Sequence, residues 1–281
     1  MSFQIMLLVL LGAFLHASWN AVVKSSRDKF LDTVLVTGGS ALLSALILPF
    51  LPMPAPASWP YAVASVVIHV GYFALVAAAY RIGDMSFAYP LMRGTAPVLV
   101  TFASGPLIGE YLSPGGWSGV LLICAGILGM TFAGSHPAAG SRGNAAWFAL
   151  ANAVVIAVYT IVDGTGVRLS GHAAAYTMWV FLFTALPLAA WAFLRRRVDL
   201  VVHCRSRWHF GLIGGACTLG AYVLALWAMT QAPVALVAAL RETAILFGTA
   251  LSALVLKERF GWTRHAAAVA VVSGAVILKL F

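Results

Sequence analysis

The chain has 281 residues, of which 62% are hydrophobic and only 9% are charged. Soluble domains carry about 25% charged residues, so the composition excludes a soluble fold and predicts a protein of the lipid bilayer. The formal net charge of +9 does not indicate a nucleic-acid partner, because the basic residues fall in short segments between apolar stretches. The three cysteines form neither a close pair nor a metal-ligand spacing, so we expect no disulfide framework, no metal site and no cofactor.

Ten apolar segments follow one another along the chain. Each segment is long enough to cross a hydrocarbon core of about 30 Å, for which a helix needs roughly 20 residues. Prolines and glycines mark several of the divisions, such as Pro114-Gly115-Gly116 between the fourth and fifth segments. The predicted spans are residues 3–23, 31–51, 59–80, 85–109, 115–134, 144–165, 173–194, 208–230, 233–256 and 262–280.

A gapless internal repeat relates the two halves of the chain. A shift of 148 residues carries Arg93 onto Arg241 and Glu110 onto Glu258. The same shift aligns Thr101 with Thr249 and Ser104 with Ser252, and a shared apolar bias would not align polar residues. We therefore expect a first five-helix repeat over residues 1–134, a linker over 135–143 and a second five-helix repeat over 144–281.

The distribution of basic residues predicts the orientation. Most of the 17 Lys and Arg residues follow the odd-numbered spans, which makes those loops cytoplasmic and places both termini on the other side. Because each repeat has an odd number of spans, the second repeat enters the membrane inverted. The predicted fold is an all-α membrane protein of ten transmembrane helices in two inverted repeats, an arrangement that places a substrate site near the midplane.

Three charged residues lie deep inside predicted spans. Arg93 and Arg241 each lie about eight residues into a span, roughly 12 Å from its start. A buried arginine costs about 2.5–3.5 kcal/mol or more in a bilayer, so each should face a cavity or a partner. We interpret them as a clamp for a substrate carboxylate; the alternative is a structural role as a brace. Glu242 then pairs with an arginine, binds a substrate ammonium or carries a coupling proton.

Aromatic and polar side chains on other spans are candidates for the wall of a substrate cavity. In the helical period, His69 shares a face with Tyr72, and Tyr89 shares one with Arg93. Packing is the alternative for each aromatic residue taken singly. The remaining candidates are His16, Trp19 and Asn20 on the first span, Tyr159 on the sixth and Tyr222 on the eighth.

Residues near span ends and kinks are expected to act in gating or capping. Glu110 and Glu258 stand at matching ends of the fourth and ninth spans, as helix caps or as latches of a gate. Pro90 and Pro97 flank Arg93 and are expected to interrupt its helix. Asp163, near the end of the sixth span, either lines an exit or is a solvated carboxylate.

Motifs at the ends of the fourth and ninth spans carry a family resemblance. Gly109-Glu110-Tyr111-Leu112 precedes a small-residue span with Cys124-Ala125-Gly126, and Lys257-Glu258-Arg259-Phe260 precedes one with Val272-Ser273-Gly274. The whole chain thus resembles the EamA-type transporters of the drug/metabolite transporter superfamily, and is similar to their YddG-like bacterial members that export amino acids and related metabolites. The resemblance implies a secondary transporter of a bacterial inner membrane, which works by alternating access without ATP.

The functional expectation is export of a small molecule, with aromatic amino acids favoured. A transporter of another metabolite or a drug is the alternative. An intramembrane enzyme is the remote one, because the few acids and histidines are scattered singly and form no catalytic constellation. Two fused halves remove the need for a dimer, so we expect a monomer whose partners are its substrate and the lipid bilayer.

Overall fold

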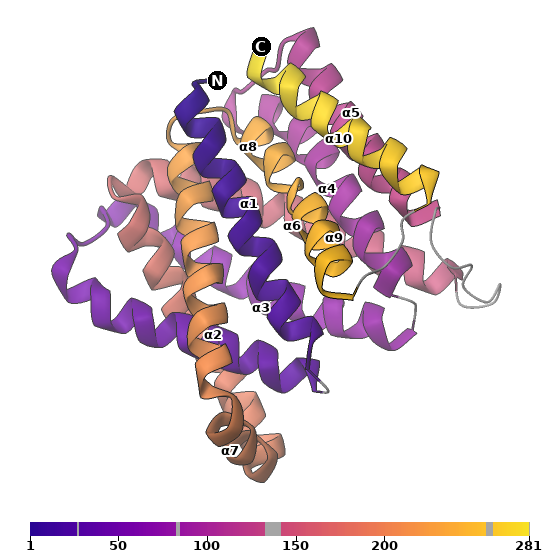
Figure 1. Cartoon of the computed structure of the whole chain (residues 1–281). Helices are drawn as coiled ribbons and strands as arrows, with labels where there is room; N and C mark the ends of the chain where they lie inside the picture. Colours follow the sequence, from indigo (N-terminus) through magenta and orange to yellow (C-terminus); the bar gives the residue numbers. More distant parts are fainter. Residues whose placement is uncertain (27, 83–84, 133–141, 257–260, 281) are drawn as a thin grey trace.

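The computed structural model describes residues 1–26, 28–82, 85–132, 142–256 and 261–280, and all regular structure in these ranges is helical. The long elements cross one another as a bundle, with both chain termini at the same end (Figure 1). The helices are α1 (Phe3–Lys24), α2 (Lys29–Ile47), α3 (Trp59–Ile82), α4 (Met85–Ile108), α5 (Pro114–Phe132), α6 (Arg142–Ser170), α7 (Ala173–Met229), α8 (Val234–Arg241), α9 (Ala244–Leu256) and α10 (Trp262–Leu280), with short 3-10 turns at Leu48–Phe50 and Pro56–Ser58.

Seven helical stretches of the described residues are long and apolar enough to cross a membrane. Pro114–Met130 of α5 is a shorter apolar helix. The longest stretch, α7, has 57 residues, which is more than twice the roughly 20 residues that one crossing needs. The all-helical membrane class is therefore confirmed, while the count of ten crossings stays a prediction. The predicted linker falls largely on residues 133–141, outside the described residues.

The sequence predicted a loop between residues 194 and 208. This prediction is wrong, because the segment is helical and its helical geometry is broken only at Arg196 (φ −143°, ψ 42°) and Arg207 (φ −129°, ψ 15°). We call residues 196–207 the elbow; there α7 turns back on itself at the tip of the molecule (Figure 1). Each bend is held by a carboxylate. Arg196 lies 2.6 Å from Asp28, and Arg207 donates two hydrogen bonds of 3.0 and 2.8 Å to buried Asp32.

The predicted ninth span is divided, while the fourth is not. Glu242 and Thr243 separate α8 from α9, although neither is a helix breaker. The interruption expected at Pro90 and Pro97 is wrong, because α4 runs through both prolines. Each proline removes only one hydrogen bond of the helical ladder. One turn later, the Thr101 hydroxyl donates to the Pro97 carbonyl at 2.7 Å.

Two helix pairs meet at glycines, which allow the backbones to approach closely. The helices α5 and α10 lie side by side (Figure 1). A Cβ on Gly274 would lie 2.7 Å from the Gly119 carbonyl oxygen, so no larger residue fits there without a shift of the backbone. In the other pair, Gly39 of α2 meets the backbone of Gly211 on the second arm of α7.

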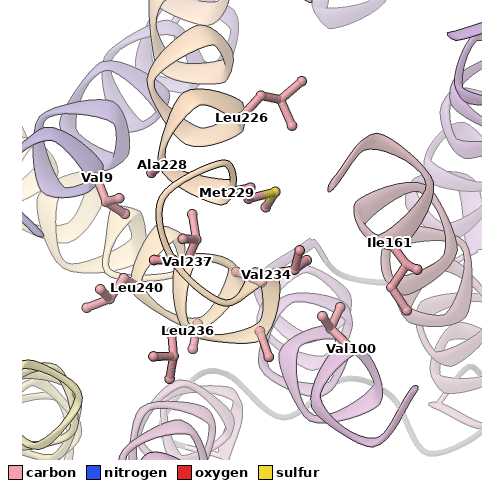
Figure 2. Packing of buried hydrophobic residues seen from close by; sticks show 14 of the residues in the cluster. Val9, Val100, Ile161, Leu226, Ala228, Met229, Val234, Leu236, Val237 and Leu240 are labelled. Carbon is pink, nitrogen blue, oxygen red and sulfur yellow. The ribbon is translucent and has the colours of Figure 1, made fainter. Parts of the chain in front are cut away.

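The short helix α8 lies at the centre of the apolar core. Every residue from Val234 to Leu240 is buried. Figure 2 shows Val234, Val237 and Leu240 of this helix surrounded by side chains from α1, α4, α6 and α7. The C-terminal end of α8, where Arg241 and Glu242 stand, is thereby fixed deep inside the bundle.

Candidate functional site

Arg93 of α4 and Glu242 at the end of α8 form a buried ion pair. Arg93 Nε lies 2.8 Å from Glu242 Oε2, and the two side chains are 5% and 7% exposed. The Nε–H does not point at that oxygen, so the contact is an attraction of charges rather than a directed hydrogen bond. Among the partners that the sequence suggested for Glu242, the structure brings Arg93 against it. The two residues come from different repeats.

Local backbone chemistry explains why charges gather at this level. Pro97 has no N–H, so it leaves the Arg93 carbonyl without its helical donor. The carbonyls at the C-terminal end of α8 carry a partial negative charge, which favours Arg241 in the last turn. The same partial charge disfavours the carboxylate of Glu242, which therefore depends on Arg93 for compensation.

The predicted cluster on the first span divides in the structure. The Arg93 guanidinium reaches His16, with Nη2 3.3 Å from Nε2. The Trp19 indole N–H lies 3.3 Å from the other ring nitrogen of His16. A neutral imidazole accepts at only one nitrogen, so His16 satisfies Arg93 or Trp19 at one time, not both. Asn20 donates to the His16 carbonyl of its own helix at 2.8 Å, which directs its amide to the backbone instead.

Arg241 stands differently from Arg93. Its guanidinium lies 5.1 Å from the centre of the Tyr222 ring, a cation–π contact. Among the residues that the structure describes, no carboxylate lies within ion-pair distance of it. Arg93 also faces a ring, with Tyr89 at 6.0 Å, but its charge is already matched by Glu242.

Aromatic rings from three helices form a wall beside these charges. His69 of α3 lies 4.5 Å from Tyr159 of α6 and 6.0 Å from Tyr222 of α7, measured between ring centres. Tyr72 lies 5.9 Å from Tyr159 and 6.5 Å from His69. His69 Nδ1 lies 2.9 Å from the Ser65 carbonyl oxygen, so we assign its proton to that nitrogen, which leaves Nε2 free to accept.

A small pocket opens between α4, α6 and the end of α8. It has room for about one water molecule, far less than a metabolite needs. Its charged lining consists of Arg93, Arg241 and Glu242, and its aromatic lining of Tyr159. The other lining residues are Ala96, Pro97, Val100, Ile156, Thr160 and Ala238.

Asp163 lies beside this region and is fully buried. Its carboxylate accepts a hydrogen bond from the Tyr222 hydroxyl at 2.5 Å and another from the Tyr176 hydroxyl at 3.2 Å. The interpretation of Asp163 as a solvated carboxylate is therefore wrong. Tyr222 contacts Asp163 through its hydroxyl and Arg241 through its ring, so it joins the two charges.

Glu110 ties three elements together at one end of the bundle. One carboxylate oxygen lies 2.5 Å from Arg168 Nη2 on α6, and the other accepts from the Val234 N–H, which begins α8, at 2.7 Å. Arg168 in turn donates to the carbonyls of Met229 and Ala232 at 2.7 and 3.1 Å. These contacts join the first repeat to the second. Glu258, the matching residue, lies outside the described residues.

Comparison with known proteins now adds the family. The profile of the EamA-like transporter family matches the chain twice, over residues 3–132 and 143–280. The chain belongs to the EamA-like transporter family. A solved structure, titled only "Crystal structure of protein", is similar with a TM-score of 0.79 and 20% identity, and the match covers 100% of this chain and 98% of the other. At that identity it supports the fold alone. No curated protein matches the chain.

Sequence reasoning found the charged residues of this candidate site but missed part of its surroundings. It singled out Arg93, Arg241 and Glu242, because charges inside apolar spans stand out. It gave no reason to choose Thr160 or Ala238, since such small residues recur throughout every span. It also missed the Asp163 cluster, whose members Tyr176 and Tyr222 are 46 residues apart in sequence and meet only because α7 turns at its elbow.

Proposed function

We propose that this transporter exports amino acids, aromatic ones favoured, or related small metabolites by alternating access without ATP. The observation that carries the substrate class is Arg241, a pocket-lining cation with no carboxylate partner among the described residues. Glu242 already compensates Arg93, so the three charges leave one positive charge for a ligand anion. The planar guanidinium fork suits a carboxylate in particular.

The aromatic wall supports the preference for an aromatic or apolar side chain. Tyr72, Tyr159, Tyr222 and His69 lie in mutual ring contact on the α3, α6 and α7 side of the site. Aromatic pairs gain about 0.5–1.5 kcal/mol beyond the burial of their area. Glu242 would accept a substrate ammonium when it turns from Arg93. A bare cation, such as a drug amine, suits the net positive site less well.

Alternating access is supported by the closure at the Glu110 end. There a network of ion pairs and hydrogen bonds joins α4, α6 and α8, and the pocket behind it is smaller than any amino acid. A substrate can enter only if one end opens. The basic residues of the elbow favour a cytoplasmic position for it, in which case the Glu110 end faces outward.

The remaining parts of the proposal concern the whole chain. We infer a monomer in a bacterial inner membrane, with ten crossings, two inverted halves and both termini outside. The halves meet at the Arg93–Glu242 pair, which is where inverted repeats place their substrate sites. The boundaries 1–134 and 144–281 follow from the internal repeat.

Uptake into proteoliposomes tests the function. The panel contains labelled aromatic, aliphatic and charged amino acids, a sugar and a drug cation, and empty liposomes serve as the background. We expect saturable counterflow of amino acids, fastest for aromatic ones. A response to the sugar or the cation alone would discard the amino-acid assignment and leave the alternative of another metabolite or drug class. A matched pair of variants, Arg241→Gln in the pocket and Arg205→Gln on the exposed elbow, separates loss of the site from loss of the fold.

A further inference from the structure

Asp163 is the exception among the acidic residues that the structure describes. Asp28 and Asp199 pair with Arg196, Asp32 pairs with Arg207, Glu110 with Arg168, and Glu242 with Arg93. Within the described ranges, Asp163 has no cationic partner within ion-pair distance, although it is fully buried. We propose that Asp163 binds the proton that is coupled to substrate transport, a step that rests on the proposed function above.

A buried carboxylate without a counter-ion is suited to binding a proton, because the proton removes its charge. An ionised carboxylate inside a protein is costly unless it is paired, and the usual outcome is that the group is neutralised by a proton. The two hydroxyls around Asp163 suit both states, because a tyrosine O–H donates to the carboxylate and its oxygen can accept from the protonated acid. Glu242, for which the sequence left the role of proton carrier open, is compensated by Arg93 instead.

The surroundings of Asp163 contain several other titratable or charged groups. Tyr176 and Tyr222 of α7 contact it directly, and Arg241 of α8 lies on the far side of the Tyr222 ring. On α6 itself, Tyr159 precedes it by one turn, and Arg168 follows but is held by Glu110. From α3, His69 lies 6.0 Å from the Tyr222 ring, and Tyr61 lies beside Gly166. Of these cations, Arg241 is the one that the substrate would neutralise.

Tyr222 therefore connects the proton site to the substrate site. A substrate carboxylate at Arg241 cancels the positive charge that favours ionised Asp163, so proton and substrate anion bind more tightly together than apart. By linkage the effect is reciprocal: protonation of Asp163 strengthens binding of the anion by the same factor. Proton and substrate then cross in the same direction, so export proceeds where the outward gradient of substrate exceeds the inward gradient of protons.

The pH dependence of substrate affinity tests the proposal. The measurement is counterflow of labelled phenylalanine in proteoliposomes, with the same pH on both sides. In the wild type, we expect the apparent affinity to rise at least about fivefold on acidification, the lower end of typical coupling. Asp163→Asn imitates the protonated acid, so it should keep the low-pH affinity at every pH. Unchanged pH dependence in Asp163→Asn would overturn the proposal, as would loss of counterflow at all pH values in a folded variant, which would make Asp163 a ligand of the substrate ammonium.

Tyr222→Phe supplies a matched variant that keeps the ring beside Arg241 and removes only the hydroxyl. The pH at which its affinity for phenylalanine changes should shift, which a purely structural tyrosine would not produce. If the wild type moves phenylalanine with no pH dependence, the proton proposal fails and the transport function stands.

A second measurement does not depend on any substrate. Infrared difference spectra of the reconstituted protein on acidification should show the carbonyl stretch of protonated carboxyl groups in the wild type, and the part of this band that Asp163 contributes should be missing in Asp163→Asn. Persistence of the whole band in that variant would assign the proton elsewhere. If no member of the substrate panel is transported, the proposed function fails, and the infrared band still decides whether Asp163 takes up a proton.

Discussion

Arg241 and Arg93 are equivalent in the internal repeat, but their environments differ. Arg241 contacts a ring and lines the pocket, while Arg93 is compensated by Glu242. We expect Arg241→Gln to raise the KM for an amino acid at least about tenfold, equal to about 1.4 kcal/mol of lost binding. The KM of Arg241→Lys should lie between those of the wild type and Arg241→Gln, because lysine keeps the charge but loses the planar fork. Initial rates of uptake at varied substrate concentration give KM, and an unchanged value for Arg241→Gln would exclude the carboxylate role.

The Arg93–Glu242 pair makes a prediction about stability rather than transport. Glu242→Gln leaves the buried guanidinium of Arg93 without compensation, which should lower the free energy of unfolding by about 3 kcal/mol. The double variant Arg93→Met with Glu242→Leu removes both charges and should recover most of that loss. Thermal unfolding of the purified protein in detergent measures both effects. Equal stability of Glu242→Gln and the wild type would mean that the pair does not stabilise the fold.

At the scale of elements, the ion pair between Glu110 and Arg168 links α6 to the segment that follows α4. Arg168→Asn removes the cation and keeps a polar side chain at this position. Without its cation, Glu110 holds only the Val234 N–H, and α8 should separate from α4 more often. A cysteine at Thr160, in the pocket, reports the opening when the three native cysteines are replaced. We expect its labelling by an external, impermeant maleimide to become several-fold faster.

Gln231→Ala is the control for this opening, because Gln231 lies exposed in the turn between α7 and α8, and the hydrogen bond of its side chain goes only to neighbouring Thr230. Labelling that rises equally in Gln231→Ala would point to a loosened turn. Labelling that stays at the wild-type rate in Arg168→Asn would show that the ion pair does not hold this end closed.

The helices were largely predictable from the sequence, while their breaks were not. Apolar length locates a span regardless of its neighbours, so segments such as 3–23 and 262–280 agree closely with α1 and α10. The bends at Arg196 and Arg207 depend on Asp28 and Asp32, which lie more than 160 residues earlier in the chain. No local pattern encodes such contacts. The break after α8 likewise follows from burial of that helix and its charged end, not from a proline or glycine.

The candidate site was predictable to the extent that charge is rare in an apolar chain. Arg93 and Glu242 were marked by their position alone, but the choice of Arg93 rather than Arg241 as the partner of Glu242 required the packing of α4 against α8. Asp163 shows the opposite case. Its place near the end of a span suggested solvent, and only the return of α7 brings two tyrosines over it.

At the scale of the whole molecule, the side on which the Glu110 end lies depends on the orientation of the chain in the membrane. The elbow carries a native reporter, Cys204, which is partly exposed between the two bends. Arginines surround it on the elbow, and the positive-inside rule places such a segment in the cytoplasm. In cells that produce the protein, with Cys217 replaced by alanine and Cys124 buried, an impermeant maleimide should therefore label Cys204 only after the membrane is opened.

Gln231→Cys, with Cys204 also replaced, reports the opposite end, since Gln231 is exposed in the turn beside the Glu110 network. It should be labelled in intact cells. If the two reporters exchange their behaviour, the chain is inserted the other way, and the Glu110–Arg168 pair closes the cytoplasmic side. The closed end would then keep substrate from entering from the cytoplasm, and the same contacts would favour uptake over export as the direction to test first.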